Sequence, residues 1–265
     1  MLKRYLLGIL TIVLFVVLAV GLSSISSNDN VEAASKKTEI IVSAAASLQD
    51  SLDKIAVQYE KQHPDIDLVF NYGASGTLQK QIEQGAPVDI FFSAGEKQMN
   101  VLVDGDLITD HKVLLKNQLV IVVPYDSKVK LTTITQLTDD KAFKKVAVGQ
   151  PESVPAGQYA QQSLTAKKVW DMLQSKLVFA KDVRQVLTYV ETGNTDAGFV
   201  YKTDALTSKK VRIALTVGAH VHKAINYPAG IVKDSGHQVE AKAFYKFLQS
   251  KEALDVFTSY GFLLP

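Results

Sequence analysis

The sequence from about residue 38 onward alternates short apolar runs with stretches in which apolar side chains recur at helical spacing. The apolar runs predict buried strands, at 39–46, 67–72, 88–93, 118–124, 145–148, 197–201 and 224–232. The amphipathic stretches predict helices, at 48–62, 78–82, 159–164, 182–191 and, as one long helix, 241–260. Strands that alternate with helices along a chain predict an α/β fold.

Two of these predicted strands carry a proline, which suggests where the chain passes between two lobes. Pro124 ends one apolar run, and Pro228 lies within another. We expect the chain to leave the first lobe once and to return to it once. The predicted first lobe comprises residues 38–123 and 227–265, and the predicted second lobe comprises residues 124–226.

The first 33 residues have the pattern of an export signal. Lys3 and Arg4 precede the apolar run 6–22, and residues 31–33 (Val-Glu-Ala) offer a small-residue cleavage site. A helix over the apolar run would extend roughly 25 Å, slightly less than a ~30 Å hydrocarbon core. We expect residues 1–33 to be a signal peptide or an uncleaved N-terminal anchor, and residues 34–37 to be a linker. The mature chain is then exported, either to a periplasm or to the outer face of the cytoplasmic membrane.

Charge and cysteine content exclude several classes of function. The chain has 265 residues, with 29 Lys and Arg against 27 Asp and Glu and a formal net charge of +2. Its lysines occur as scattered pairs without a basic stripe, so we expect no nucleic-acid partner. The sequence contains no cysteine. This excludes disulfides, thiolate metal sites, a cysteine nucleophile and a cysteine-linked lipid.

Small residues mark four predicted helix starts. Ser47 and Ser75 each follow a strand, Ala156 follows a proline, and Val183 follows Asp182, a candidate N-cap. Open α/β sheets bind ligands where helices begin at the ends of strands. The first N–H groups of a helix have no partner within it and lie at the positive end of the helix dipole, so they bind anions without Lys or Arg. The alternative is that the serines only cap their helices, a position that serine prefers.

Five short motifs follow one another along the chain. They are Ala-Ala-Ala-Ser-Leu at 44–48, Gly-Ala-Ser-Gly-Thr-Leu at 73–78 with Gln-Ile-Glu-Gln-Gly-Ala-Pro at 81–87, Gly-Gln-Pro-Glu-Ser-Val-Pro-Ala-Gly-Gln-Tyr at 149–159, Asp-Val-Arg at 182–184, and Gly-Phe-Val-Tyr-Lys-Thr-Asp-Ala at 198–205. In this order they resemble the motifs of the molybdate-binding proteins of ABC importers. The segment 243–262 fits as well, so the resemblance extends from about residue 39 to residue 262.

This resemblance implies a two-lobed, type II periplasmic-binding-protein fold that holds an oxyanion in the cleft between its lobes. Matched motif by motif, it implies that Ser47 and Ser75 each give a hydroxyl and a backbone N–H. Ala156 and Val183 would give backbone N–H groups, and Tyr201 its phenolic O–H.

The function implied by the resemblance is that of an extracytoplasmic solute-binding protein and not of an enzyme. The protein would capture molybdate, and tungstate with it, and deliver it to the membrane permease of an ABC importer. The resemblance implies a monomer without a cofactor. Molybdenum would be bound as the oxyanion, with no side chain coordinating the metal directly.

Other interpretations stay open at this point. The ligand could be another oxyanion such as sulfate. An extracellular Ser-His-Asp hydrolase is the enzyme alternative, since five histidines are available, although Thr77 stands where a G-x-S-x-G nucleophile elbow requires glycine. His220 and His222 could bind a metal as a pair, but two ligands are fewer than a metal site needs. Arg184 either adds a positive charge to the cleft or is an exposed residue of a first helical turn.

Overall fold

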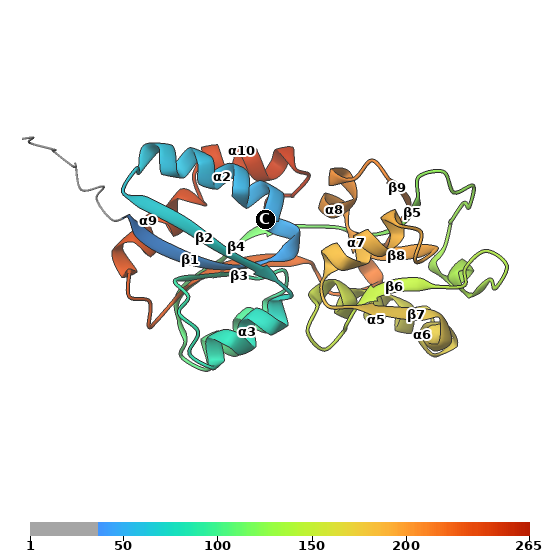
Figure 1. Ribbon diagram of the computed structural model, residues 1–265. Coiled ribbons are helices and arrows are strands. Elements are labelled where there is room, and N and C mark those ends of the chain that lie inside the picture. Colours follow the sequence, from blue (N-terminus) through green and yellow to red (C-terminus); the bar gives the residue numbers. More distant parts are fainter. Residues whose placement is uncertain (1–36) are drawn as a thin grey trace, which may run out of the picture. The chain divides into compact units, whose positions relative to one another are not determined.

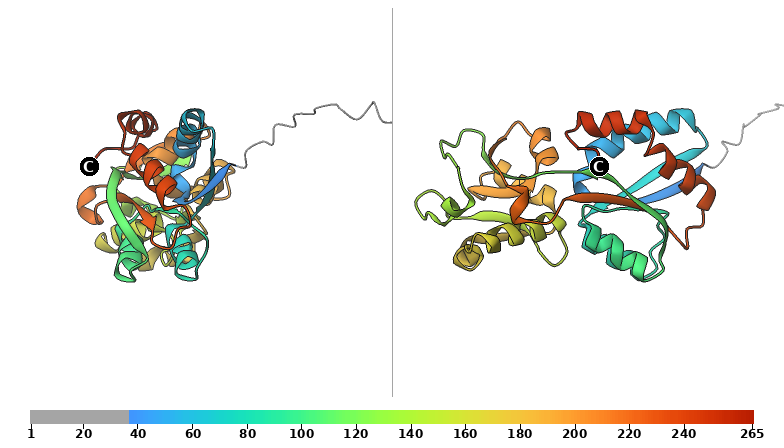
Figure 2. Two further views of the ribbon diagram at one scale, coloured as in Figure 1. Left: turned by 90° about the vertical axis from the view of Figure 1, so that its left-hand side faces the viewer. Right: turned by 180° about the vertical axis from the view of Figure 1, so that it is seen from behind.

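The computed structural model of the protein describes residues 37–265, which contain ten strands (Figures 1 and 2). The strands are β1 Thr38–Ala45, β2 Ile66–Gly73, β3 Ile90–Phe92, β4 Ile108–Lys116, β5 Leu119–Pro124, β6 Val146–Gly149, β7 Leu177–Ala180, β8 Ala197–Tyr201, β9 Val211–Thr216 and β10 Asn226–Val232.

The described residues also contain nine α-helices and four short 3₁₀ helices. The α-helices are α2 Gln49–Gln62, α3 Ser75–Glu83, α4 Glu96–Asp104, α5 Pro155–Ala166, α6 Trp170–Leu173, α7 Val183–Glu191, α8 Lys202–Thr207, α9 Gln238–Phe247 and α10 Lys251–Ser259. The 3₁₀ helices are η1 Ala46–Leu48, η2 Ile134–Thr138, η3 Gln174–Lys176 and η4 Ala219–Val221. The predicted signal or anchor, residues 1–33, lies outside the described residues, as does most of the predicted linker. Within residues 37–265, no helix is long and apolar enough to cross a membrane.

The two sheets are arranged alike, and helices alternate with their strands along the chain, which confirms the α/β prediction. The first sheet has the order β2-β1-β3-β10-β4, and the second has the order β7-β6-β8-β5-β9. In each sheet the fourth strand in this order is antiparallel to its neighbours, whereas the first three are parallel. Strands β1 and β8 lie inside their sheets and read as nearly continuous apolar runs, as expected for strands buried on both faces.

The predicted first boundary between the lobes, at residues 123 and 124, is wrong. Strand β5 pairs with β8 and β9 and so belongs entirely to the second lobe. The chain crosses instead at Asn117 and Gln118, between β4 and β5, and returns just before β10. The two crossings run beside each other (Figure 2), and the N–H of Asn117 donates to the carbonyl of Ile225 at 3.1 Å. A proline at the end of a strand therefore did not mark the crossing.

Each sheet is covered by helices. In the first lobe, α2, α9 and α10 bury their apolar side chains on one face, and α3 and α4 cover the other (Figure 1). In the second lobe, α5 and α7 pack against β6 and β8. The helix predicted over 241–260 is in fact two helices, because Ser250 begins α10 as an N-cap that accepts a hydrogen bond from the N–H of Ala253 at 3.3 Å. This interruption turns α10 onto α2.

Candidate functional site

Four helices begin at one small cavity between the lobes. In the first lobe η1, which leads into α2, and α3 follow β1 and β2 directly, and in the second lobe α5 and α7 follow the loops after β6 and β7. The cavity is small, with a volume of about 10 Å³, roughly what one water molecule needs. Its lining comprises Ala45, Ala46, Ser47, Gly73, Ala74, Ser75, Ala94, Val154, Pro155, Ala156, Val183 and Tyr201. All five residues expected to bind the ligand therefore line the same cavity.

Backbone N–H groups at these helix starts have no hydrogen-bond partner in the part of the chain that the structure describes. Within residues 37–265, the N–H groups of Ser47, Ser75, Ala156 and Val183 donate to no backbone or side-chain acceptor. Pro155 occupies the first position of α5, so the N–H of Ala156 is the first that this helix offers. Ala156 and Val183 have no polar side chain, and only their backbone can contribute to a polar site.

The two serines do not cap their helices. Ser75 is the first residue of α3, whose N-cap is Ala74, and neither α3 nor η1 has a side-chain cap. The hydroxyl oxygen of Ser75 instead accepts a hydrogen bond from the N–H of Ala94 at 3.0 Å, so its own proton is free for a ligand. Ser47 Oγ lies 2.9 Å from the hydroxyl of Tyr227 on β10. The capping alternative is therefore wrong for both serines, whereas the expected N-cap Asp182 is confirmed by its bond from the N–H of Gln185 at 2.8 Å.

The phenols at the cavity are buried and keep their protons. Tyr201 ends β8 with 1% of its surface exposed, and its ring meets that of Tyr227 edge to face at a centroid distance of 5.6 Å. Burial raises the pKa of both phenols well above the ordinary value. The Tyr201 hydroxyl has a long contact, 3.5 Å, to the carbonyl of Ala94 and also interacts with the Tyr227 hydroxyl, and it can turn to a ligand as a donor.

The lobes meet directly beside the cavity. The N–H of Gly76 on α3 donates to the carbonyl of Ser153, in the loop before α5, at 2.8 Å. A methyl group added at Gly76 would lie 2.7 Å from that carbonyl oxygen. Only glycine permits this approach, so the structure has the lobes closed on the cavity.

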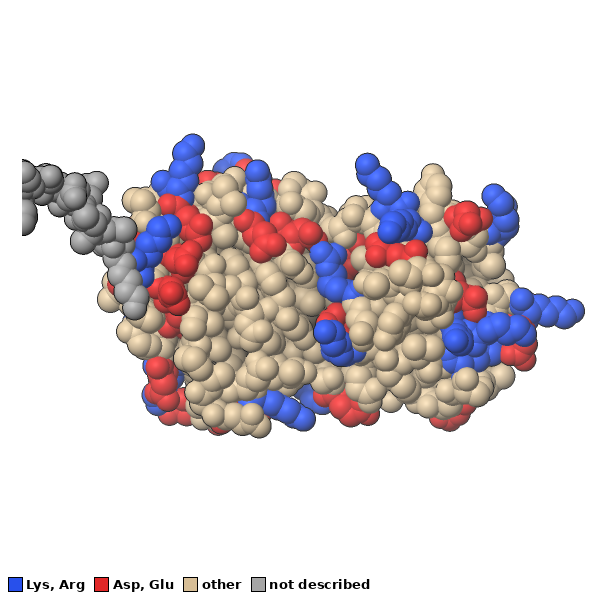
Figure 3. Space-filling model, viewed as in Figure 1, with Lys and Arg blue, Asp and Glu red and all other residues tan. Residues whose placement is uncertain are grey.

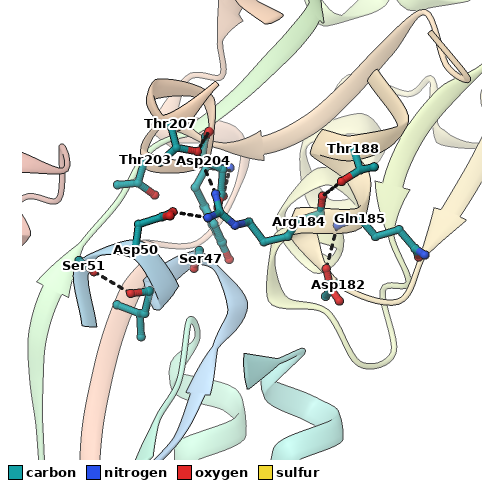
Figure 4. Close-up of polar contacts among 12 residues, drawn as sticks. Ser47, Asp50, Ser51, Asp182, Arg184, Gln185, Thr188, Thr203, Asp204 and Thr207 are labelled. Carbon is teal, nitrogen blue, oxygen red and sulfur yellow. Dashed lines mark hydrogen bonds and ion pairs between the residues drawn. The ribbon is translucent and has the colours of Figure 1, made fainter. Parts of the chain in front are cut away.

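Arg184 is not among the residues that line the cavity. It extends into a cluster of charges that also joins the lobes (Figure 4). Its guanidinium pairs with Asp50 on α2, donates to Thr207 Oγ1 at 2.9 Å and lies 3.8 Å from Asp204 Oδ1. Arg184 is therefore not an exposed first-turn residue, and its charge lies between the lobes but outside the cavity lining. It is a partly buried residue that connects α7 to the first lobe.

Asp204 is the buried member of this charged cluster. One of its oxygens accepts from the N–H of Tyr201 at 3.2 Å, and the other has no hydrogen bond. Burial raises the pKa of Asp204 to about 7, although Arg184 opposes the shift. The carboxyl of Asp204 therefore changes between its neutral and charged forms near neutral pH.

The geometry does not assemble the hydrolase or the metal site. The cavity lining contains no histidine, so neither serine there has a general base. A Ser-His-Asp group does occur elsewhere in the first lobe, but Ser235 Oγ donates to Asp89 at 2.6 Å. The His237 imidazole also contacts Asp89, and His237 reaches Ser235 Oγ only through its backbone N–H, at 3.1 Å. Within residues 37–265, no group of three or more His, Cys, Asp or Glu side chains is placed to hold a metal ion, including at His220 and His222.

Sequence reasoning missed the residues that support the cavity from behind. Ala94 follows β3 in a Ser-Ala-Gly segment, the same small-residue pattern that marked the other strand ends, and could have been found by it. Asn117 and Tyr227 lie at the two crossings between the lobes, and no local signal distinguishes them from ordinary core residues. Their role depends on contacts between distant parts of the chain.

The surface carries charges of both signs. On the face seen in Figure 3, Lys and Arg mix with Asp and Glu along the edges and at the centre of the view, and broad uncharged areas lie to either side of the centre. That face has no basic stripe of the kind that binds a phosphate backbone.

Comparisons with known proteins agree with this architecture. The family of bacterial extracellular solute-binding proteins matches residues 40–263. YvgL of Bacillus subtilis, named as a candidate ABC transporter substrate-binding lipoprotein, is 50% identical over 99% of each chain. The molybdate-binding protein ModA of Haemophilus influenzae is 42% identical over 84% of this chain and 89% of its own length. The solved periplasmic molybdate-binding protein of Azotobacter vinelandii covers 85% of this chain and 99% of its own with a TM-score of 0.77 and 24% identity, which supports the shared fold.

These matches confirm the predicted family and the two-lobed type II fold. The chain belongs to the bacterial extracellular solute-binding proteins, among the relatives of the molybdate-binding proteins.

Proposed function

We propose that this chain is the substrate-binding component of an ABC importer, that it captures molybdate and tungstate, and that it acts as a monomer without catalysing a reaction. The observation that carries the proposal is a small cavity between the lobes that is lined by donors and free of charged side chains. Four unpaired backbone N–H groups and the hydroxyls of Ser47, Ser75 and Tyr201 surround it. The ModA relatives are named as molybdate-binding proteins, which supports this ligand.

Selectivity follows from the kind of donor present. A fully deprotonated tetrahedral dianion accepts at every oxygen and satisfies every donor. Phosphate near neutral pH carries a proton, and that proton would need an acceptor where the lining has no carboxylate. A buried group left unpaired in this way costs about 1–3 kcal/mol. Sulfate has the right charge but shorter bonds, so that it leaves some donors out of reach.

The cellular role follows from the family. Its members are named as extracellular solute-binding proteins, and we propose that this chain is exported and delivers its oxyanion to a membrane permease. The B. subtilis relative is named as a lipoprotein, whereas this sequence has no cysteine to carry a lipid. Retention near the permease would then depend on an enclosed periplasm or on the apolar run 6–22.

Calorimetric titration of the purified protein with molybdate, tungstate, sulfate and phosphate tests the proposal. We expect molybdate and tungstate to bind much more tightly than sulfate, and phosphate to bind most weakly. Equal affinities for sulfate and molybdate would contradict the ligand assignment and leave the anion site intact. Absence of binding to all four oxyanions would overturn the proposed function.

A further inference from the structure

Ser47 lines the cavity and is also the last member of a buried series of hydrogen-bonded side chains. This series determines the direction in which the Ser47 hydroxyl proton points. The series runs from Asn117, at the first crossing between the lobes, through Tyr227 on β10 to Ser47. Asn117 is 8% exposed, Tyr227 is fully buried and Ser47 is 6% exposed. Buried polar groups of this kind are normally fully paired, so the pairing can be worked out donor by donor.

The amide of Asn117 has only one possible orientation. Its Oδ1 accepts from the N–H of Gln118 at 2.8 Å, and a backbone N–H can only donate. Its Nδ2 therefore faces the other two partners, Thr203 Oγ1 at 2.9 Å and the Tyr227 hydroxyl at 3.3 Å. An amide NH₂ cannot accept a hydrogen bond. The oxygen of Tyr227 must accept from Asn117.

Tyr227 then passes this direction on to Ser47. Asn117 Nδ2 donates to its oxygen, so of the two groups that hydrogen-bond the Tyr227 hydroxyl within residues 37–265, only Ser47 Oγ, at 2.9 Å, can accept the phenolic proton. Ser47 Oγ accepts this proton. The proton of the Ser47 hydroxyl is therefore left to donate to an acceptor in the cavity, which Ser47 lines.

We propose that Asn117 and Tyr227 are positioning residues that hold Ser47 as a hydrogen-bond donor toward an oxyanion. This inference rests on the proposed function and deepens it, because it explains why a hydroxyl that could equally accept is committed to donation. Thr203, the second partner of Asn117, lies on α8 of the second lobe. The same amide thus fixes the hydroxyl and contacts both lobes where the chain crosses.

The test is a double-mutant cycle with molybdate titrations. Tyr227→Phe keeps the ring and removes the hydroxyl. We expect it to weaken molybdate binding about tenfold, since a net hydrogen bond is worth about 1 kcal/mol and one to a charged group more. In a Ser47→Ala background the same change should have less than about a twofold effect, because there is no hydroxyl left to orient. Tyr245→Phe, at a buried tyrosine on α9, is the matched control and should leave affinity unchanged.

Asn117→Asp tests the other end of the series and serves if Tyr227→Phe does not fold. A carboxylate only accepts, so Tyr227 would donate to it and the Ser47 proton would turn toward Tyr227. Asn117→Asp should reduce affinity more in the otherwise wild-type protein than in the Ser47→Ala variant, where only the added charge can act. Equal losses in both backgrounds for either variant would overturn the inference while leaving the proposed function in place. A wild-type protein that binds none of the four oxyanions would overturn both.

Discussion

Two neighbouring regions join the lobes, and they are built in opposite ways. The cavity is lined by small residues, serines and a tyrosine, without a charged side chain. The cluster of Arg184, Asp50 and Asp204 consists of charges that are matched among themselves. In the cavity only dipoles and hydrogen bonds are available for a ligand, so the ligand must bring the charge. The charges of the cluster contact one another, and the pair that crosses the lobes favours the closed arrangement whatever the ligand is.

The largest loss of ligand affinity should come from a substitution that keeps the lobes apart. Gly76→Val places a side chain where even a methyl group would lie 2.7 Å from the Ser153 carbonyl oxygen. We expect a loss of molybdate affinity of roughly 3 kcal/mol, about 100-fold or more, because overpacking at a rigid backbone contact opposes closure. Calorimetry measures the loss. Gly236→Val is the control, since a side chain there meets nothing within 4 Å. Unchanged affinity in Gly76→Val would show that closure at this contact is not required.

Removal of single hydroxyls should weaken ligand binding in the cavity without abolishing it. Ser47→Ala, Ser75→Ala and Tyr201→Phe each remove one donor and leave every backbone N–H in place. We expect each to reduce affinity by about 1.5–3 kcal/mol, the range for hydrogen bonds to a charged group. Titration of each variant, with Ser259→Ala on α10 as a distant control, gives the comparison. If all three variants bound like the wild type, the donor cavity would not be the oxyanion site.

The charged cluster should have a smaller effect on affinity, and one that depends on salt. Asp50→Asn removes the pair that crosses the lobes and leaves Arg184 beside Asp204. Because both partners are partly exposed, we expect a loss of about 0.5–1 kcal/mol in molybdate affinity, which shrinks in high salt. Asp255→Asn removes an exposed pair with Lys251 within one helix and should not change affinity. A salt-independent loss in Asp50→Asn would contradict an electrostatic role.

The last effect concerns the dependence of stability on pH and not ligand affinity. The pKa of Asp204 is raised to about 7 by burial, with Arg184 opposing and Asp50 and Asp182 supporting the shift. The folded protein therefore holds this proton more tightly than the unfolded chain. The contribution of Asp204 to the free energy of unfolding should fall as pH rises from about 4 through about 7, and then level off.

Asp204→Asn removes this titration. In urea unfolding at pH 5, 6, 7 and 8, the variant should gain on the wild type as pH rises to about 7 and keep a constant difference above it. Parallel curves over the whole range would show that Asp204 keeps an ordinary pKa in the folded protein.

The sequence predicted the local parts of the site better than their surroundings. Strand ends followed by Ser47 and Ser75 are short-range patterns, and the structure brings them to one cavity as expected. The crossing at Asn117 was missed because the apolar run 118–124 fits either sheet equally well. Strands β4, β7 and β9 were missed because they lie at sheet edges, where exposed positions interrupt the apolar pattern. What the sequence could not reveal depends on contacts between residues far apart in the chain.

The place of β10 in the first sheet has a consequence for the order of folding. This strand lies between β3 and β4, and β4 pairs with no other strand of the sheet. The first sheet therefore cannot close until the whole second lobe has been synthesised and residues 226–232 have arrived. Pairing of such distant segments is slow, because the entropy of closing a long loop must be lost before the contacts form. A chain that emerges from its N-terminus thus stays open for most of its synthesis, which is compatible with the export proposed above.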